Sequence, residues 1–264
     1  MARSCTGNAI QSMISANLQL LSFDVFGTLV SVRDGSYGAF RSILREAGAP
    51  SVDVKSFWEC WEEHNIAHYR EPYRSYKAIC QMSLDEAFAH FGIPGRGSIQ
   101  PYFDAFPHFP LYPDVIPTLE ILKKSHRLAI VSNIDDDLLT ATPLPGVFDL
   151  ICTAERAGGY KPDGTLFRYF LTRAGGTTDT ILHSGQSQLT DLVGGKPLGL
   201  TIAWINRRGV ALDPSVPRPD YVFGDIASLI PLLRATLPAT TSDASGGGSR
   251  HGSLRSPMAI MGRS

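Results

Sequence analysis

The chain has 264 residues, 43% of them hydrophobic and 19% charged, which is room for one large domain or for a core domain with a smaller insertion. A formal net charge of −1 excludes the broad basic field that attracts nucleic acid or an anionic membrane. No apolar run is long enough to span a bilayer, and the four cysteines lack the spacing of a zinc site or of a disulfide framework. We therefore expect a cytoplasmic protein with a small-molecule substrate and neither a nucleic-acid nor a membrane partner. The sequence leaves open whether the protein forms a homodimer.

The two ends of the chain differ in composition from its middle. Residues 1–17 are polar and mixed, without the basic flank and apolar block of a signal peptide, and they predict a flexible leader. From residue 236 onwards the sequence contains few large apolar residues. Such a segment buries too little surface to offset the entropy of ordering it, so residues 236–264 predict a disordered tail.

Between these ends, short apolar runs alternate with helical patterns. The expected strands lack polar alternation, as strands covered on both faces do, and are Leu18–Phe23, Leu128–Ser132, Thr180–His183, Thr201–Ile205 and Tyr221–Phe223. The expected helices are Asp114–Lys124, Asp136–Thr140, Thr165–Ala174, Leu189–Leu198 and Ile226–Arg234. This alternation predicts an α/β fold with a doubly wound, parallel, Rossmann-like sheet.

A long insertion follows the first expected strand. Residues 35–110 have helical periodicity over Ser56–Tyr69 and Tyr76–Phe91, no convincing strand, and more length than a crossover helix needs. In open α/β sheets, ligands bind at the carboxyl ends of the strands. We therefore expect a helical cap domain at 35–110 over this edge, and an α/β core built from residues 18–34 and 111–235.

Four short segments follow expected strands and place polar side chains at the carboxyl edge of the sheet. They are FDVFGTLV at 23–30, VSN at 131–133, GYKPD at 159–163 and HSGQSQLTD at 183–191. Each segment alone is a weak signal, because Asp, Ser and Lys are common in the loops between strands and helices. Their order and spacing together are specific.

In this order the segments resemble the four motifs of the haloacid dehalogenase superfamily. The resemblance covers residues 18–235, including the place of the inserted cap, and is greatest to the 2-haloacid dehalogenase branch. That branch is matched by FDVFGTL at the first motif, Ser132-Asn133 at the second, Lys161-Pro162-Asp163 at the third, and the stretch from Gly199 to Arg207 after the fourth. The resemblance implies a hydrolase that forms a covalent intermediate on an aspartate.

The resemblance also implies residue roles. Asp24 would be the nucleophile, attacking carbon or phosphorus to give an ester or an acyl phosphate that water then cleaves. Lys161 would neutralise charge around Asp24, and Asp191 would orient Lys161, the hydrolytic water or a metal. The implied substrate-binding residues are Thr28, Ser132, Asn133, Phe26 and Ser187.

Two departures from the superfamily's phosphatases favour dehalogenase-like chemistry. Phe26 stands two residues after Asp24, where phosphatases carry the aspartate that protonates the leaving alcohol. Gln186 stands where they usually carry another aspartate, which weakens a Mg²⁺ site because this ion prefers a charge-rich oxygen shell. A halide leaving group needs no proton. We therefore expect no cofactor, while under a phosphatase alternative Asp24 and Asp191 would hold Mg²⁺.

Other positions depart from the dehalogenase pattern. The residue aligned with the family's halide-binding arginine is Glu59, and Phe167 replaces a tyrosine six residues after the third-motif lysine. Arg70, Arg74 or Lys77 could supply the missing cation. We therefore expect a rebuilt leaving-group site.

Three functional hypotheses follow. The first is a metal-independent hydrolase of the 2-haloacid dehalogenase type, acting on a small organic substrate. The second is a Mg²⁺-dependent phosphatase without its usual acid, and the third is a non-catalytic relative that binds a metabolite. Several residues also have structural interpretations: His183 as a core histidine, Trp58 and Trp61 as cap packing, Asp135–Asp137 as a helix start, and Arg207 as a tie for the end of a strand.

Overall fold

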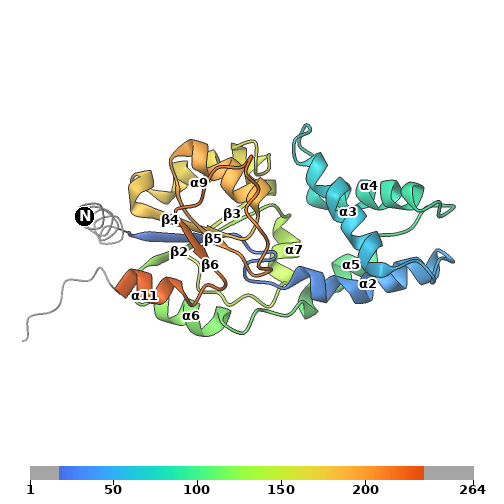
Figure 1. The fold of residues 1–264 in the computed structure, drawn as a ribbon, viewed down its shortest axis with the longest axis horizontal. Coiled ribbons are helices and arrows are strands. Elements are labelled where there is room, and N and C mark those ends of the chain that lie inside the picture. The colour runs from blue at the N-terminus through green and yellow to red at the C-terminus, as the bar shows by residue number, and fades with distance from the viewer. Residues whose placement is uncertain (1–17, 235–264) are drawn as a thin grey trace, which may run out of the picture.

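The computed structural model describes residues 18–234, and the leader and tail expected at 1–17 and 236–264 lie outside the described residues. A six-stranded parallel sheet with helices on both faces stands beside a second layer made of helices (Figure 1). The strands, in the order β3-β2-β1-β4-β5-β6, confirm the predicted doubly wound α/β class. They are β1 (Leu20–Phe23), β2 (Arg127–Ser132), β3 (Leu150–Thr153), β4 (Ile181–Gly185), β5 (Thr201–Ile205) and β6 (Tyr221–Phe223).

β3 is a strand that the sequence pattern missed. It pairs with β2 at one edge of the sheet, where Ile151 lies opposite Ile130. It has the sequence LICT, only four residues long, and its first two residues are only partly buried.

The two faces of the sheet are covered by different helices. Side chains alternate along β1, so Leu21 and Leu20 point to opposite faces. Leu21 packs among residues of α6 and α11, and Leu20 packs among residues of α9. The helices beside the sheet are α6 (Val115–Leu122), α7 (Asp136–Ala141), α8 (Ala154–Ala157), α9 (Thr165–Ala174) and α11 (Leu229–Arg234).

The helix expected at Leu189–Leu198 is a broken segment. It divides into η3 (Gln188–Leu192), α10 (Val193–Gly195) and η4 (Lys196–Leu198). Glycine and proline are the poorest helix formers, and the segment holds both. At Gly195 a side chain would not fit, because an added Cβ would lie 2.8 Å from Ile202 of β5. Close packing on the sheet therefore overrides the helical pattern.

The helical layer consists of residues 32–108. Its elements are α2 (Val32–Glu46), α3 (Val54–His68), α4 (Tyr76–His90), α5 (Gln100–Asp104) and η1 (Phe106–His108). α2 begins before residue 35, so the boundary expected between 34 and 35 falls inside this helix. Side chains cap the next two helices: Asp53 accepts a hydrogen bond from Ser56 N, and Ser75 accepts one from Ala78 N.

An aromatic core holds the helical layer together. Phe40 of α2 lies 5.0 Å from Trp61 of α3 and 5.6 Å from Tyr102 of α5, measured between ring centroids. Aromatic pairs at such distances stabilise beyond the area that they bury. Phe57 and Phe88 extend the same core to α4. The aromatic residues of 57–61 thus pack the helical layer, as the sequence suggested.

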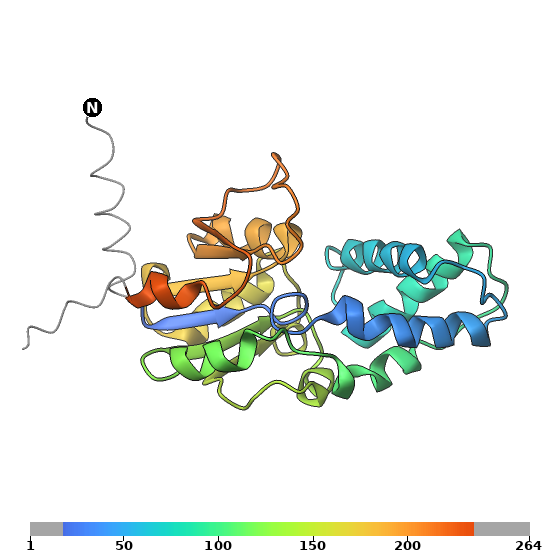
Figure 2. The same cartoon turned by 60° about the horizontal axis from the view of Figure 1, so that its bottom comes forward.

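The helical layer faces the carboxyl ends of the strands. Figure 2 shows β1 pointing toward it. The buried Asp135, just after β2, accepts hydrogen bonds from Tyr76 N at 2.8 Å and Lys77 N at 3.0 Å. The acidic run at 135–137 does begin a helix, as expected: Asp135 is the N-cap residue of α7, and Asp136 and Asp137 lie in its first turn. The Asp135 side chain makes no hydrogen bond to α7 and instead accepts from the first turn of α4. Tyr160 adds a second tie by donating its hydroxyl to Arg74 O at 2.7 Å.

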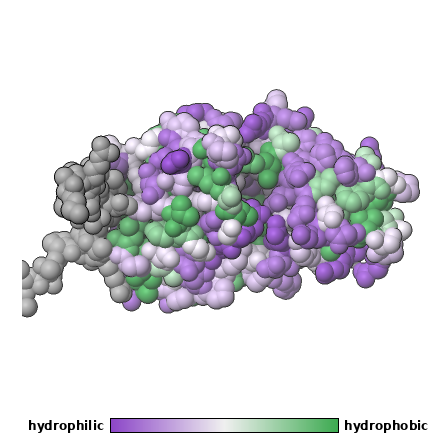
Figure 3. Space-filling view, in the orientation of Figure 1, coloured by the Kyte–Doolittle hydropathy of each residue, from purple (hydrophilic) through white to green (hydrophobic). Residues whose placement is uncertain are grey.

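The outer surface gives no sign of a membrane span. Within residues 18–234, no helix combines the length and the apolar character that a bilayer crossing needs. The face drawn in Figure 3 mixes hydrophilic and hydrophobic residues over both layers.

Candidate active site

Asp24 stands directly after β1, at the centre of the sheet's carboxyl edge. Its backbone N–H donates to Ser184 O of the neighbouring β4 at 2.9 Å. The chain then turns sharply at Gly27, whose φ of 83° lies in the left-handed region that favours glycine. The turn keeps Asp24 close to the surface of a cavity while leaving it only 7% exposed.

Lys161 connects the residues that the sequence assigned to catalysis. Its ammonium donates to Asp24 Oδ1 at 2.8 Å, to Asp191 Oδ1 at 2.7 Å and to Val131 O at 3.0 Å. An ammonium has three hydrogens, so all of its donor capacity is used. Lys161 is 1% exposed and Asp191 is fully buried. The structure therefore brings Asp24, Lys161 and Asp191 together in one buried cluster.

The cluster shifts the pKa values of its members. Burial raises the pKa of Asp24 above its ordinary value, with the charge of Lys161 opposing the shift and that of Asp191 adding to it. Burial would raise the pKa of Asp191 too, but Lys161 and His183 outweigh it and hold that pKa well below its usual range. Burial would lower the pKa of Lys161, yet its two carboxylate partners raise it. The lysine is therefore a permanent cation at neutral pH.

Asp191 is held by hydrogen bonds to neighbouring groups on the β4 side of the cluster. Ser187 N donates to Asp191 Oδ2 at 3.0 Å, and His183 Nε2 lies 3.3 Å from Asp191 Oδ1. His183 is fully buried, with its Nδ1 3.0 Å from Ser22 Oγ, which agrees with a core histidine. An added Cβ at Gly185 would lie 2.2 Å from Asp191 Oδ2, so glycine is required there.

Thr28 has a different place from the one expected. It is fully buried and does not line the cavity. Its hydroxyl donates to Asp24 Oδ2 at 2.8 Å and accepts from Gln186 N at 2.9 Å. Because both bonds stay within the protein, the geometry makes Thr28 a positioning residue for Asp24 and not a substrate contact.

Ser132 and Asn133 both line the cavity, but they differ in what they offer. Asn133 accepts from Lys161 N at 2.8 Å and donates to Lys161 O at 2.9 Å, so its amide holds the lysine loop. Ser132 is 1% exposed, and its Oγ has no hydrogen-bond partner among the described residues. A buried hydroxyl without a partner is costly, which points to a ligand that completes its bonding.

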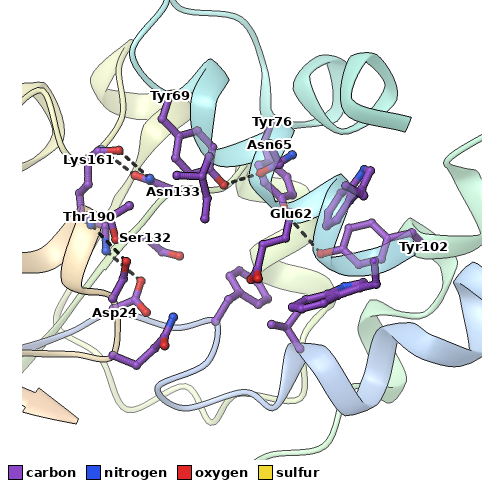
Figure 4. Close-up of a pocket in the computed structure, with 17 residues that line it drawn as sticks. Asp24, Glu62, Asn65, Tyr69, Tyr76, Tyr102, Ser132, Asn133, Lys161 and Thr190 are labelled. Carbon is purple, nitrogen blue, oxygen red and sulfur yellow. Dashed lines mark hydrogen bonds and ion pairs between the residues drawn. The ribbon is translucent and has the colours of Figure 1, made fainter. Parts of the chain in front are cut away.

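The cavity lies between the sheet edge and the helical layer and has a volume of about 100 Å³. Figure 4 shows Asp24, Ser132 and Lys161 on one side, and Glu62, Asn65 and Tyr102 of the helical layer on the other. Phe26, Gln186 and Ser187 complete its lining near Asp24. The Ser187 hydroxyl accepts from Thr190 N at 3.1 Å, so it also supports the turn at the start of η3.

Three further residues singled out in the sequence lie near the cluster. The Phe26 ring packs edge-to-face on Phe106, with centroids 5.5 Å apart, and presents no acid to the cavity. Phe167 lies with its ring centroid 5.9 Å from Lys161 Nζ, below the cluster. Arg207 binds Asp114 bidentately at 2.9 and 3.1 Å, and it also donates to Thr28 O at 2.7 Å, so it does tie down a strand end.

The cations considered for the leaving-group site do not reach the cavity. Arg74 pairs with Glu71 and Lys77 with Asp137, both at exposed positions, and Arg70 is exposed as well. Glu59, the residue aligned with the halide-binding arginine, is half exposed and pairs with Lys55 at 3.9 Å. Within residues 18–234, Lys161 is the one Lys or Arg among the cavity-lining side chains.

Glu62 is a cavity residue that sequence reasoning missed. It lies three residues after Glu59, nearly one helical turn further along α3, and on the face of this helix that lines the cavity. A signal was present, because Trp58, Glu62, Asn65 and Tyr69 share the spacing of one helix face. Two polar residues on an otherwise aromatic face indicate more than packing.

The donor set fits a divalent cation poorly. Asp24 and Asp191 each direct one oxygen to Lys161 Nζ, and the next side chain at the edge is the Gln186 amide. Among residues 18–234, no group of three or more His, Cys, Asp or Glu side chains has the geometry to hold a metal. Mg²⁺ needs near-octahedral oxygen ligation. We therefore assign no catalytic step to a metal.

The structure thus combines a parallel α/β sheet with a buried carboxylate–lysine–carboxylate cluster at its carboxyl edge. A family model described as haloacid dehalogenase-like hydrolase matches residues 18–199. The chain belongs to this family.

The relatives of this chain differ in the activity that their names state. The chain is 28% identical over 250 residues to mouse haloacid dehalogenase-like hydrolase domain-containing protein 3, covering 84% of this chain and 97% of the relative. It is 22% identical over 232 residues to haloacetate dehalogenase H-2 of Moraxella sp., covering 82% and 98%. It is also 27% identical over 215 residues to a Thermus thermophilus phosphoserine phosphatase, covering 76% and 84%.

Solved structures support the fold. An L-2-haloacid dehalogenase from Xanthobacter autotrophicus superposes with a TM-score of 0.70 at 19% identity, covering 82% of this chain and 98% of that one. At this level of identity the similarity shows the fold alone. This fold agrees with the haloacid dehalogenase-like hydrolase family to which the chain belongs.

Proposed function

We propose that this protein is a hydrolase that uses Asp24 as a covalent nucleophile on a small organic substrate, in the manner of (S)-2-haloacid dehalogenases. The observation that carries the proposal is the placement of Asp24 at the cavity, with one oxygen held by Lys161 and the other by Thr28. A carboxylate held on both oxygens and partly desolvated is a serviceable nucleophile. The helical layer would then act as the cap expected at 35–110.

In the first step, an Asp24 oxygen attacks the carbon that bears the leaving group. A C–O bond forms as the bond to the leaving group breaks, and the leaving group departs with the electron pair. Lys161 stays cationic throughout, so it balances the charge of Asp24 before attack and of the departing anion afterwards. Phe26 lines the cavity near Asp24 and supplies no proton.

In the second step, water adds to the carbonyl carbon of the Asp24 ester. The bond between this carbon and the ester oxygen, which came from Asp24, breaks. One proton of the water passes to the departing oxygen to give an alcohol and the other is released to solvent, which restores the carboxylate. Ser132 has the free hydroxyl that can hold a substrate oxygen in both steps. Asp191, whose pKa stays low beside Lys161 and His183, fixes the ammonium and not the substrate.

The leaving group is one that departs without protonation. The residue two positions after Asp24 is the apolar Phe26, so the usual acid for an alcohol leaving group is missing. The donor set around Asp24 and Asp191 also favours chemistry that is independent of Mg²⁺. A halide meets this requirement, and a phosphate monoester does not.

A substrate panel with and without EDTA tests the proposal. Chloro- and bromo-substituted small molecules, phosphate monoesters and activated acyl esters would be assayed with purified protein. We expect halide release that survives exhaustive chelation. Phosphate release that requires added Mg²⁺ would instead assign the protein to the family's phosphatases.

A further inference from the structure

Glu62 presents a carboxylate to the cavity from the side opposite Asp24. It lies on α3, is partly buried, and lines both the main cavity and two neighbouring hollows. Figure 4 shows its side chain extending from the helix toward the Asp24 side. Burial raises its pKa, with Arg208 and Arg33 opposing the shift from a distance, and no hydrogen bond contributes. Glu62 is therefore a carboxylate that no described side chain satisfies.

The charges around the cavity do not suit an anionic substrate. Its lining holds two acids, Asp24 and Glu62, and a single cation, Lys161, whose three hydrogens are already used. Arg33 packs over the Trp58 ring, with its guanidinium carbon 5.3 Å from the centroid, and lines a neighbouring hollow instead. A second carboxylate brought in by a substrate would meet Glu62 in this cavity, while Arg33 and Arg208, the two arginines that oppose the shift of its pKa, line the neighbouring hollows.

Ser132 gives an independent sign that a ligand completes this cavity. Its hydroxyl is almost fully buried and has no partner, although it lies among the lining residues. A substrate that spans from Ser132 to Glu62 would satisfy a hydroxyl on the sheet side and a carboxylate on the helical side. The end at Glu62 must be a hydrogen-bond donor, whereas the Ser132 hydroxyl can donate or accept.

We propose that Glu62 selects the substrate by binding an ammonium group at the end remote from the carbon that Asp24 attacks. The substrate class is then a short, primary-amine-bearing electrophile and not a 2-haloacid. This inference rests on the proposed function of Asp24 for turnover, while the binding preference stands on the cavity alone. A hydrogen-bonded ion pair in a partly dry site makes such a preference large.

Binding and turnover of matched three-carbon compounds test the inference. For binding, n-propylammonium, 1-propanol and propionate would be titrated into wild-type protein, Glu62→Gln and Glu63→Gln. Glu63 is the exposed neighbour of Glu62 and serves as the charge-matched control. For turnover, bromide release from 3-bromopropylammonium, 3-bromopropanol and 3-bromopropionate would be compared as kcat/KM near pH 7, with enzyme-free blanks.

We expect wild-type protein to prefer the ammonium over the alcohol by about tenfold or more, and to disfavour the carboxylate. Glu62→Gln should bring the ammonium-to-alcohol ratio close to one, while Glu63→Gln should keep the wild-type ratio. Equal losses for all three compounds in Glu62→Gln, or a wild-type preference for the carboxylate, would overturn the inference.

The two proposals fail in different ways. If no bromide is released and no Asp24 adduct forms, the nucleophile proposal fails, and the binding ratios still decide the role of Glu62. If bromide is released without an ammonium preference, the nucleophile stands and the Glu62 inference fails.

Discussion

Lys161 donates its ammonium to Asp24 Oδ1 at 2.8 Å, although the two residues stand 137 positions apart in the chain. The contact forms because β1 and the loop before α9 end at the same edge of the sheet. Both side chains are buried, so each depends on the other for charge compensation.

Removing the charge of Lys161 should destabilise the fold. Lys161→Met leaves the carboxylates of Asp24 and Asp191 facing each other without a cation. Breaking a buried ion pair in this way costs about 3–5 kcal/mol of unfolding free energy. Denaturant unfolding at neutral pH measures this loss. The control is Lys77→Met, whose ion pair with Asp137 is exposed and should contribute at most about 1 kcal/mol.

A comparable small effect for both lysine variants would contradict the account of the cluster. Near-UV circular dichroism of Lys161→Met would show whether the native packing survives in the folded fraction.

On the acidic side of the pH profile, kcat/KM should fall at a higher pH than it would for an aspartate with an ordinary pKa. Asp24 attacks only as the carboxylate, so kcat/KM falls as pH drops through its pKa in the folded protein. Burial raises this pKa, with Lys161 opposing and Asp191 adding to the shift, so the limb should lie above about pH 4. The pKa of Lys161 is raised, so this residue should give no alkaline limb at neutral pH. A pH profile of kcat/KM, with the folded fraction checked at each pH, decides the point.

A limb at or below the ordinary aspartate value would mean that Lys161 dominates burial at Asp24. That result would reverse the direction assigned to this pKa.

Ser132→Ala should raise the stability of the fold and lower the catalytic efficiency. The Ser132 hydroxyl is buried and unpaired, so removing it should raise the free energy of unfolding by about 1 kcal/mol. The same change removes a substrate contact, so kcat/KM should fall by about tenfold. Ser83→Ala is the control, because the Ser83 hydroxyl is buried but donates to Ile79 O at 2.9 Å. It should lower stability slightly and leave kcat/KM unchanged.

A stability loss in Ser132→Ala, like that of Ser83→Ala, would show that an ordinary internal hydrogen bond had been removed. The free hydroxyl would then not be part of the site.

Asp24→Asn should remove turnover without unfolding the protein. The amide has the same shape as the carboxylate, and Lys161 keeps its bonds to Asp191 and Val131. Loss of the nucleophile should lower kcat by roughly a thousandfold or more. Steady-state halide release, with thermal unfolding as the folding check, measures both. A variant that keeps more than a few per cent of wild-type turnover would refute the nucleophile assignment.

The sequence predicted the sheet core because its inner strands are continuous apolar runs buried on both faces. The meeting of Asp24, Lys161 and Asp191 was implied by the resemblance of the four motifs to the haloacid dehalogenase superfamily. The pattern missed β3, a four-residue strand at the edge of the sheet whose first two residues are only partly buried. It also failed over Leu189–Leu198, where the segment holds two glycines and a proline, with Gly195 packed against β5, and is broken into three short turns.

The side chains that line the substrate side of the cavity could not be predicted from the sequence in the same way. Its residues come from helices whose rotation about their axes decides which side chain points inward. Alignment through neighbouring aromatic residues suggested Glu59, whereas the structure places Glu62 at the cavity. Thr28 was likewise expected to touch substrate, but the bond from Gln186 N to its hydroxyl comes from a strand end far along the chain.

The central claim, that Asp24 forms a covalent ester, is tested most directly by a single turnover in ¹⁸O water with enzyme in excess. When Asp24 displaces the leaving group, the product oxygen comes from its side chain, and water then repairs the ester at its carbonyl carbon. The first product should therefore be unlabelled, and mass spectrometry of the peptide containing Asp24 should find one ¹⁸O in it. Label in the product of the first turnover, with an unlabelled Asp24 peptide, would mean direct attack by water and would contradict the covalent mechanism.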